Sequence, residues 1–454
     1  MPPYLFVPGL RDRLTFAVNR LREKLWIRPL LLCVVSLTGI GLAHLADQFI
    51  PAAALPDIST DTLETLLRTI TSSMLVIAVF AAGSMLSAYA SAASVATPRA
   101  FTLVVADDIS QYALSTFIGA FIFGIVALIA LINGVYGRSG RLALFVLTIG
   151  VFIVVVLSFV TWVDRIARLG RVPNTIDRVE KAAARALLER GLHPTLQAKP
   201  AAFSAANPPA SGPHHQGLPI HAQEVGYLRR IDLAELQQVA ETLDLDLVIE
   251  ALPGAFVTPR RVLARVIGAA HLQADSTKEL AAAFRIGNRR TFDDDPRFGL
   301  VVLSEIASRA LSPAVNDPGT AIHIIGSFVR LFSQWAEASC QREEAATVAP
   351  RFNRISVPEL ALEDLLDDAF QALGRDGAPC LEVGLHLQKG LYLISLLPVP
   401  ALQTVARAQA RLALDHGERA LRLAQEVERL RQAAAWILQP AEQGEEPWSR
   451  CDRA

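Results

Sequence analysis

Four long apolar stretches in the first third of the chain place the strongest constraint on its fold. A helix needs about 20 mainly apolar residues to cross the hydrocarbon core of a bilayer. Residues 29–49, 70–92, 112–136 and 142–163 meet this requirement, although the second stretch is rich in serine and alanine. Only 19% of the 454 residues are charged, against about a quarter in soluble domains. The sequence therefore predicts an integral membrane protein with four transmembrane helices.

Basic residues near these stretches predict the orientation, because cytoplasmic flanks are enriched in lysine and arginine. Several arginines precede the first stretch, and Arg165, Arg168 and Arg171 follow the fourth. Acidic residues dominate between the first two stretches, whereas two arginines in the last short loop run against the trend. Trp162 falls where the cytoplasmic aromatic belt is expected. We therefore expect both termini in the cytoplasm.

Patterns of polarity divide the chain into five segments. They are an amphipathic N-terminal segment (1–28), a transmembrane domain (29–171), a helix with a Pro/Ala/Ser-rich linker (172–220), a small β-rich module (221–270) and a helical cytoplasmic domain (271–454). The leucines of segment 1–28 share one helical face, which suits a helix in the membrane interface or one packed on the cytoplasmic part. The predicted class is mainly α: four transmembrane helices followed by a mixed α/β, helix-rich cytoplasmic domain.

Local patterns also place individual elements in the cytoplasmic part. We expect a strand over 225–231, a helix over 232–243 capped by Asp232, a strand over 244–252 and a turn at Pro253-Gly254. Apolar residues at helical spacing predict helices over 174–192, 360–373 and 403–438. Because the last helix is long and has no evident partner within the chain, we expect it to pack as an oligomer contact or against other helices.

The most distinctive run, residues 288–320, contains the pair Asp-Pro twice, at Asp295-Pro296 and at Asp317-Pro318. A carboxylate before a proline at the first helical position caps free amides and complements the helix dipole. We therefore expect one helix from Pro296 to about residue 311 and a second from Pro318 to about residue 335. The chain should turn back at Ser312, bringing the corner residues near Arg309 and also near Asp295.

This run resembles the bacterial family of predicted membrane proteins called domain of unknown function 2254. The matching residues are Arg290, Thr291, Asp295, Pro296, 309–313, 316–318, Thr320 and Ala321, with further matches at 97–99, Asp107, Gln111 and the turn 253–257. Asp294 stands where the family usually has glutamine, and Thr258-Pro259 replaces a glycine-containing step. The resemblance implies N-terminal transmembrane helices, a cytosolic region and a multi-pass location in the bacterial inner membrane. It implies no activity.

The first functional class is a channel or transporter built as a homo-oligomer. The second apolar stretch carries small residues at four-residue spacing. Close packing between transmembrane helices is the simplest explanation of this spacing. In a symmetric oligomer such a face can also line a water-filled path, and the candidate pore-facing residues are Gly83, Ser84, Ser87 and Ser91. Only His44 and Asp47 are ionisable within a predicted span, and an interfacial position explains both.

The second class is a membrane-anchored enzyme, and the third is a regulator whose cytoplasmic domain senses a ligand or partner. Clustered carboxylates with an asparagine could hold magnesium, and the candidates are Asp293, Asp294, Asp295, Arg309, Ser312, Asn316, Asp317 and His323. Helix capping explains the aspartates, and a lone histidine between isoleucines is more often a packing residue. His214-His215 in the linker is expected to be solvated. We therefore assign no catalytic, cofactor or metal residue.

Composition excludes further classes. Basic and acidic residues balance at 43 against 44, which disfavours nucleic-acid binding. The four cysteines are scattered, which excludes a disulfide framework or a cysteine zinc site. We expect an oligomeric inner-membrane protein in contact with the lipid bilayer, channel- or transporter-like with a cytoplasmic regulatory domain; a membrane-anchored regulator or metal-dependent enzyme is the alternative. The candidate motif residues are Arg290, Thr291, Asp295, Arg309, Ser312, Asn316, Asp317 and Thr320.

Overall fold

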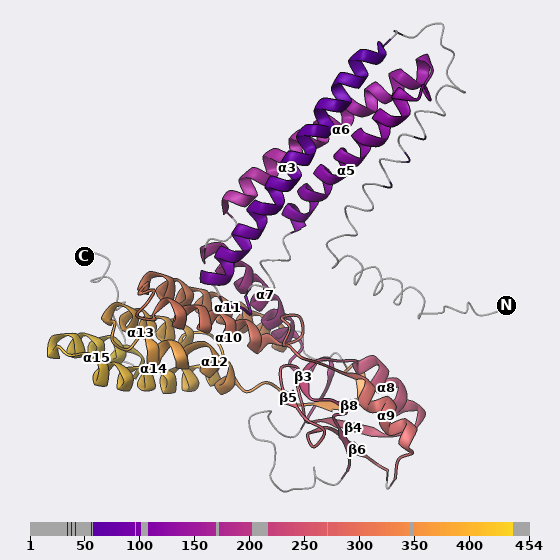
Figure 1. Cartoon of the computed structure of the whole chain (residues 1–454). Coiled ribbons are helices and arrows are strands. Elements are labelled where there is room, and N and C mark those ends of the chain that lie inside the picture. Colours follow the sequence, from indigo (N-terminus) through magenta and orange to yellow (C-terminus); the bar gives the residue numbers. More distant parts are fainter. Residues whose placement is uncertain are drawn as a thin grey trace. The chain divides into compact units, whose positions relative to one another are not determined.

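The computed structural model describes residues 58–95, 97–100, 108–168, 172–201, 217–269, 271–344 and 349–438, with isolated positions before residue 58. The chain divides into two compact units, residues 1–175 and 176–454, called here the N-terminal unit and the C-terminal unit (Figure 1). Apart from isolated positions, the predicted first span with His44 and Asp47 lies outside the described residues, as do the amphipathic segment and His214-His215.

Three long helices run side by side in the N-terminal unit, namely α3 (Thr60–Val95), α5 (Asp108–Ile132) and α6 (Arg138–Arg168) (Figure 1). Each contains a segment long and apolar enough to cross a membrane, over Thr60–Ser91, Ser110–Ile132 and Arg138–Ile166. The helix α5 ends before the predicted residue 136, because the chain turns at Gly134. That glycine has a φ of +68°, the left-handed conformation that commonly ends helices.

Apolar side chains fill the contacts among these three helices. Leu63 and Leu67 of α3 belong to one buried cluster with Phe123 of α5 and Leu144 of α6. Trp162 of α6 is only 1% exposed, and its ring centroid lies 6.1 Å from that of Phe80 and 6.3 Å from that of Phe117. The three helices therefore enclose the Trp162 ring, and its position at the depth of the cytoplasmic aromatic belt stays a prediction.

Most of the C-terminal unit is a helical bundle. Its helices are α7 (Val172–Leu192), α10 (Pro296–Ala310), α11 (Pro318–Glu344), α12 (Leu362–Asp376), α13 (Leu381–Ser395), α14 (Pro400–Ala420) and α15 (Ala424–Leu438). Phe328 and Phe370 meet edge to face in the core with centroids 5.1 Å apart. At Gly299 of α10, a Cβ would lie 2.4 Å from the Cβ of Ala183, so this glycine lets α10 and α7 approach closely.

The predicted long helix 403–438 is two helices, α14 and α15, separated by residues 421–423. Both pack on α13 and on each other. A Cβ at Gly417 would lie 2.3 Å from Leu430, which shows how closely α15 folds back on α14. The expectation that this segment lacks a partner within the chain is therefore wrong.

The remaining part of the C-terminal unit contains two sheets. The larger has the order β1-β8-β4-β6-β2, and β8 runs parallel to both β1 and β4, while the other pairs are antiparallel. Its strands are β1 (Ala198–Pro200), β8 (Phe352–Val357), β4 (Asp246–Ile249), β6 (Val262–Ile267) and β2 (Leu218–His221). The smaller is antiparallel, with β3 (Gly226–Ile231) between β5 (Phe256–Val257) and β7 (Phe284–Gly287). Helices α8 (Leu233–Thr242) and α9 (Ala274–Ala282) accompany the sheets.

Sequence patterns located part of this region correctly. The strands β3 and β4 and the helix α8 occur where they were expected, and Asp232 caps α8 by accepting a hydrogen bond from the amide of Glu235 at 3.1 Å. Two expectations are wrong: β1 and β2 lie within the predicted linker, and β8 lies within the part predicted to be helical. The described residues therefore form a helix-rich structure with three candidate spans and a mixed α/β region.

Candidate functional site

The candidate motif residues form two groups at opposite ends of α10. Arg290, Thr291 and Asp295 precede this helix, and the others follow it, namely Arg309, Ser312, Asn316, Asp317 and Thr320. The helix has 15 residues and is therefore about 22 Å long at 1.5 Å per residue. The expected approach of Asp295 to the corner is wrong, and the motif contains two separate sites.

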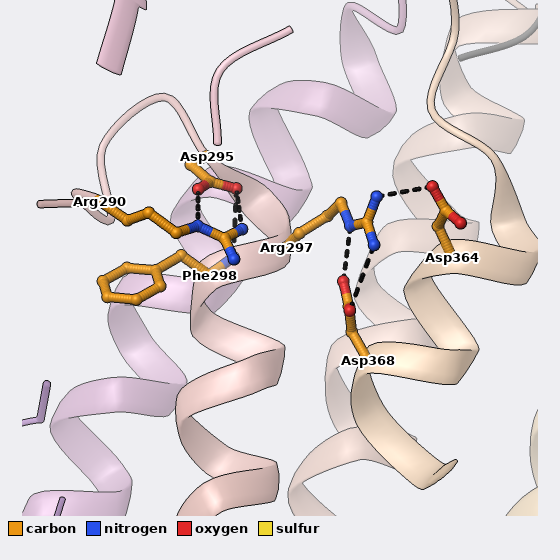
Figure 2. Close-up of polar contacts among 6 residues, drawn as sticks. All are labelled: Arg290, Asp295, Arg297, Phe298, Asp364 and Asp368. Carbon is orange, nitrogen blue, oxygen red and sulfur yellow. Dashed lines mark hydrogen bonds and ion pairs between the residues drawn. The ribbon is translucent and has the colours of Figure 1, made fainter. Parts of the chain in front are cut away.

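The first group forms a buried junction around Asp295, whose side chain is 2% exposed (Figure 2). The Nε and Nη2 atoms of Arg290 donate hydrogen bonds of 2.7 and 3.0 Å to its two carboxylate oxygens. The amide of Phe298 donates to Oδ1 at 3.2 Å, so Asp295 also caps α10. Because the guanidinium of Arg290 also lies 5.1 Å from the centroid of the Phe298 ring, the pair is held in a single geometry.

The Pro253-Gly254 turn packs directly on this carboxylate. Gly254 has a φ of +96°, and a Cβ there would lie 2.5 Å from Oδ2 of Asp295. Burial raises the pKa of Asp295 above its ordinary value, against the lowering effects of the Arg290 hydrogen bond and charge, the Phe298 amide and Arg297. The turn and the motif, which were recognised separately in the sequence, thus form one junction between the sheets and the helical bundle.

A neighbouring ion-pair group fixes α10 to α12 (Figure 2). Nη1 of Arg297 lies 2.6 Å from Asp364 Oδ2, and its Nε lies 2.6 Å from Asp368 Oδ2. Burial alone would lower the pKa of Arg297, but the hydrogen bond to Asp368 and the charges of both aspartates raise it above its ordinary value. The sequence analysis missed this group, although Asp364 and Asp368 are spaced to share one helical face.

The second group, at the other end of α10, is an exposed corner. Asp317 caps α11 by accepting hydrogen bonds from the amide and the hydroxyl of Thr320 at 3.1 and 2.6 Å. The hydroxyl of Ser312 donates to the carbonyl of Arg309 at 2.7 Å, and Asn316 adopts a φ of +50°. The expected turn and cap are confirmed. Arg309 itself is exposed.

The other candidates are dispersed. His323 is exposed on α11 rather than packed, because successive residues of an α-helix point in directions about 100° apart and Ile324 takes the buried side. Gly83, Ser87 and Ser91 are exposed on α3, and Ser84 is half-buried. In the described parts of the chain, no group of three or more His, Cys, Asp or Glu side chains could hold a metal ion.

A cavity of about 270 Å³ lies where α7, β3, α8 and β8 converge. We call it the Arg230 cavity, and its polar lining includes His193, Gln197, Arg230, Asp232, Asp294 and Arg351. Burial raises the pKa of Asp294, and the neighbouring Asp293 adds to this, against the lowering effects of Arg230 and Arg190. The sequence analysis did not identify this cavity, because its arginines are more than a hundred residues apart.

Arg190 of α7 interacts through its charge with Asp294, which lines the cavity, and with Asp295 of the junction. It is 5% exposed, and burial lowers its pKa to about 10, so it remains charged at neutral pH. Its Nη1 donates to the carbonyl of Pro194 at 3.2 Å, while Nη2 has no hydrogen-bond partner among the described residues. Helical spacing from Ala183 and Leu187 could have located it on the buried face.

Comparisons with known proteins agree with the membrane character of the chain. The family model for predicted membrane protein, DUF2254, matches residues 22–392. An uncharacterised protein of Mycobacterium bovis and one of Mycobacterium tuberculosis are each 32% identical over 117 residues, which cover 25% of this chain. The match covers only 22% of the length of each relative. No solved structure matches the chain.

Proposed function

The chain belongs to the DUF2254 family of predicted membrane proteins, and we propose that it is a ligand-responsive regulator of the bacterial inner membrane. In this proposal, α3, α5 and α6 cross the membrane together with the stretch 29–49, and both termini lie in the cytoplasm. The C-terminal unit acts as the cytoplasmic sensor. The observation that carries the proposal is the course of α7.

Helix α7 begins at Val172, shortly after α6 ends at Arg168, and it has 21 residues, which corresponds to about 32 Å. At its C-terminal end Glu189 and His193 line the Arg230 cavity. In its middle, Glu180 makes hydrogen bonds of 2.7 and 2.8 Å with Arg330 of α11. A continuous helix thus connects a wall of the cavity with the chain segment that follows the last span. A ligand that binds one conformation of the cavity more tightly would thereby shift the conformational equilibrium of that span.

The proposal includes assembly of the membrane helices as a homo-oligomer. The exposed face of α6 carries bulky apolar side chains that suit lipid, including Phe152, Ile153, Leu157 and Val160. Helix α3 also exposes bulky apolar side chains, among them Val76 and Leu86, but it carries in addition a stripe of small exposed residues, Gly83, Ser87 and Ser91, at four-residue spacing. A Cβ on Gly83 would meet nothing within 4 Å among the described residues. Small residues favour close helix–helix contact in membranes, which supports this face as a contact with a second copy.

Crosslinking in native membranes tests the assembly. In a background where the native cysteines are serine, Ser87→Cys should crosslink between copies, whereas the control Val154→Cys on the lipid-facing side of α6 should not. A Gly-Ser insertion between Arg168 and Val172 then tests the regulation. If the C-terminal unit acts on the spans through α7, the insertion should uncouple the two and change the rate at which Ser87→Cys crosslinks between copies. Equal rates would show that the C-terminal unit does not control the spans.

A channel or transporter is the second candidate, because the same exposed serines of α3 could line a path between copies. Ion flux through the purified protein in liposomes separates the two functions. Flux that is lost in Ser87→Leu, but retained in a matched Val154→Leu variant, would favour conduction. Sealed vesicles, together with crosslinking that responds to the α7 insertion, would favour the regulator.

A further inference from the structure

From the lining of the Arg230 cavity, we infer that the C-terminal unit binds a small phosphate-bearing anion between the guanidinium groups of Arg230 and Arg351. This inference rests on the sensor role proposed above and names its ligand. It requires cationic donors that are free to engage a ligand, a cavity of suitable size and a reason why the nearby carboxylates do not repel an anion.

The two arginines differ from their neighbours in their contacts. Arg230 is paired across the sheet with Arg285, and Arg285 reaches Glu235 at 3.2 Å. Arg354, close to Arg351 in sequence, reaches Asp244 at 2.7 Å. The side chains of Arg230 and Arg351, which line the cavity, make no hydrogen bond or ion pair with any residue that the structure describes. The guanidinium of Arg351 lies 5.2 Å from the centroid of the Phe352 ring, and the charge of Arg230 acts on Asp294, so the donor groups of both arginines keep their hydrogen-bonding capacity. Their planar donor groups match the oxygens of a phosphate.

Backbone donors add to these charges. Leu233 and Ala234, which line the cavity, are the first two residues of α8. Asp232 accepts from the amide of Glu235, so the amides of Leu233 and Ala234 keep no acceptor among the described residues. Free amides and the positive end of the helix dipole favour an anion at this position.

The carboxylates of the lining are each accounted for. The side chain of Glu189 is 71% exposed and lies 4.0 Å from His193, so it is solvated. Asp232 is engaged as the cap of α8. The pKa of Asp294 is raised by burial and by Asp293, so this carboxyl is more easily protonated when an anion approaches and can then donate a hydrogen bond.

The shape of the cavity indicates a small ligand. Its volume of about 270 Å³ is just below the roughly 300–1,000 Å³ usual for drug-sized ligands. One wall is formed by Leu196 and Gln197, which have φ values of +55° and +63°. The carbonyl of Gln197 accepts a hydrogen bond of 3.1 Å from the amide of Phe352. That bond fixes the wall to the first residue of β8, so the site is formed before a ligand arrives.

Calorimetric titration of the full chain in detergent tests the inference with inorganic phosphate and glycerol 3-phosphate as probes. Succinate serves as a carboxylate of similar size, and vesicles of phosphatidylglycerol supply the phosphate of a lipid headgroup. We expect phosphate probes to bind, and succinate to bind at least about tenfold more weakly. Binding to the soluble probes identifies a free metabolite, and binding to the vesicles alone identifies a lipid headgroup; both support recognition of phosphate.

Variants assign the binding to the cavity. Arg230→Gln and Arg351→Gln should each weaken binding by about tenfold or more, because each removes hydrogen bonds to a charged group. The matched control Arg285→Gln, which removes an arginine outside the lining, should bind like the unchanged chain. The inference is overturned if no phosphate probe binds, if succinate binds as well, or if both cavity variants bind normally. Binding that is retained after the Gly-Ser insertion, without any effect of phosphate on crosslinking, would instead refute the sensor role alone.

Discussion

The two ends of α10 use the same pair of residues in opposite surroundings. Asp295-Pro296 begins α10 inside a junction where the carboxylate is buried, paired with Arg290 and covered by Gly254. Asp317-Pro318 begins α11 at an exposed corner, where the carboxylate only caps the helix and bonds Thr320. The comparison teaches that a capping signal fixes where a helix starts, whereas its energetic weight depends on what the tertiary structure places against the carboxylate.

The largest effect is expected for Asp295→Ala. This change removes a cap, leaves Arg290 without its ion-pair partner and removes a carboxylate whose charge acts on the buried Arg190. Breaking such a pair costs about 3–5 kcal/mol, so the melting temperature of the full chain in detergent should fall sharply. Asp295→Asn, which keeps a capping oxygen, should recover part of the loss. The comparison fails if Asp295→Ala melts no lower than Asp317→Ala.

Gly254→Ala should have the next largest effect, because a Cβ there would meet Asp295 at a left-handed backbone position. Such strain costs about 1–3 kcal/mol, and displacement of the carboxylate adds to it. Gly268 provides the control, since its φ of +94° is similar but a Cβ there would meet nothing within 4 Å. Thermal unfolding of both alanine variants measures the difference. Equal losses would mean that the contact with Asp295 contributes nothing.

Lowering the pH should affect stability differently through Glu180, which is paired favourably, and through the buried Asp295. Burial alone would raise the pKa of Glu180, but the hydrogen bonds from Arg330 and Ser327 and the charge of Arg330 lower it below its ordinary value of 4.5. A carboxylate whose pKa is lower in the folded state stabilises that state at any pH above its pKa in the unfolded chain. This contribution is lost as the pH falls through its pKa in the folded state. The pKa of Asp295 is raised in the folded state, so protonation of this carboxyl favours the folded state and acid causes no loss of stability through it.

The stability of the unchanged chain should therefore fall as the pH is lowered below 4.5, and the fall should be smaller in Glu180→Gln. Melting temperatures measured across this range supply the slope. Glu337→Gln changes an exposed glutamate on α11 and controls for the loss of one acidic group. If both variants keep the slope of the unchanged chain, the Glu180–Arg330 pair does not contribute to acid sensitivity.

The smallest effects are expected at the corner. Asp317→Ala removes a cap and should cost about 0.5–2 kcal/mol, while Arg309→Ala at an exposed position should stay within about 0.5 kcal/mol. Both follow from the exposure of the corner and can be measured alongside Asp295→Ala. A severe loss in Arg309→Ala would show that the corner is more than a turn between two helices.

Features determined by nearby residues could be predicted from the sequence. The caps Asp232, Asp295 and Asp317 all begin helices where expected, because a cap and its amides lie within three residues of each other. The apolar stretches likewise mark α3, α5 and α6. The predicted ends of these helices are less accurate, since a turn such as that at Gly134 depends on the backbone conformation of one residue.

Features determined by distant residues could not be predicted. The break between α14 and α15 contains neither glycine nor proline, and it depends on Leu430 packing against Gly417. The strand β1 has three residues and pairs with β8 about 150 residues later, so neither strand carries a local signal. The Arg230 cavity depends on the same pairing, because β8 brings Arg351 to the end of β3.

The position of β8 in the sheet has a consequence for synthesis of the chain on the ribosome. Because β8 lies between β1 and β4, these two strands cannot join one sheet until residues 352–357 have been made. From the end of β4 at Ile249 to Phe352 the ribosome adds about 100 residues, which takes roughly 5–20 s at 5–20 residues per second. During that time the edges of β1 and β4 are unpaired, at a stage when the apolar stretches have already left the ribosome. This interval is when chaperone protection or mispairing with another nascent chain would decide the yield of folded protein.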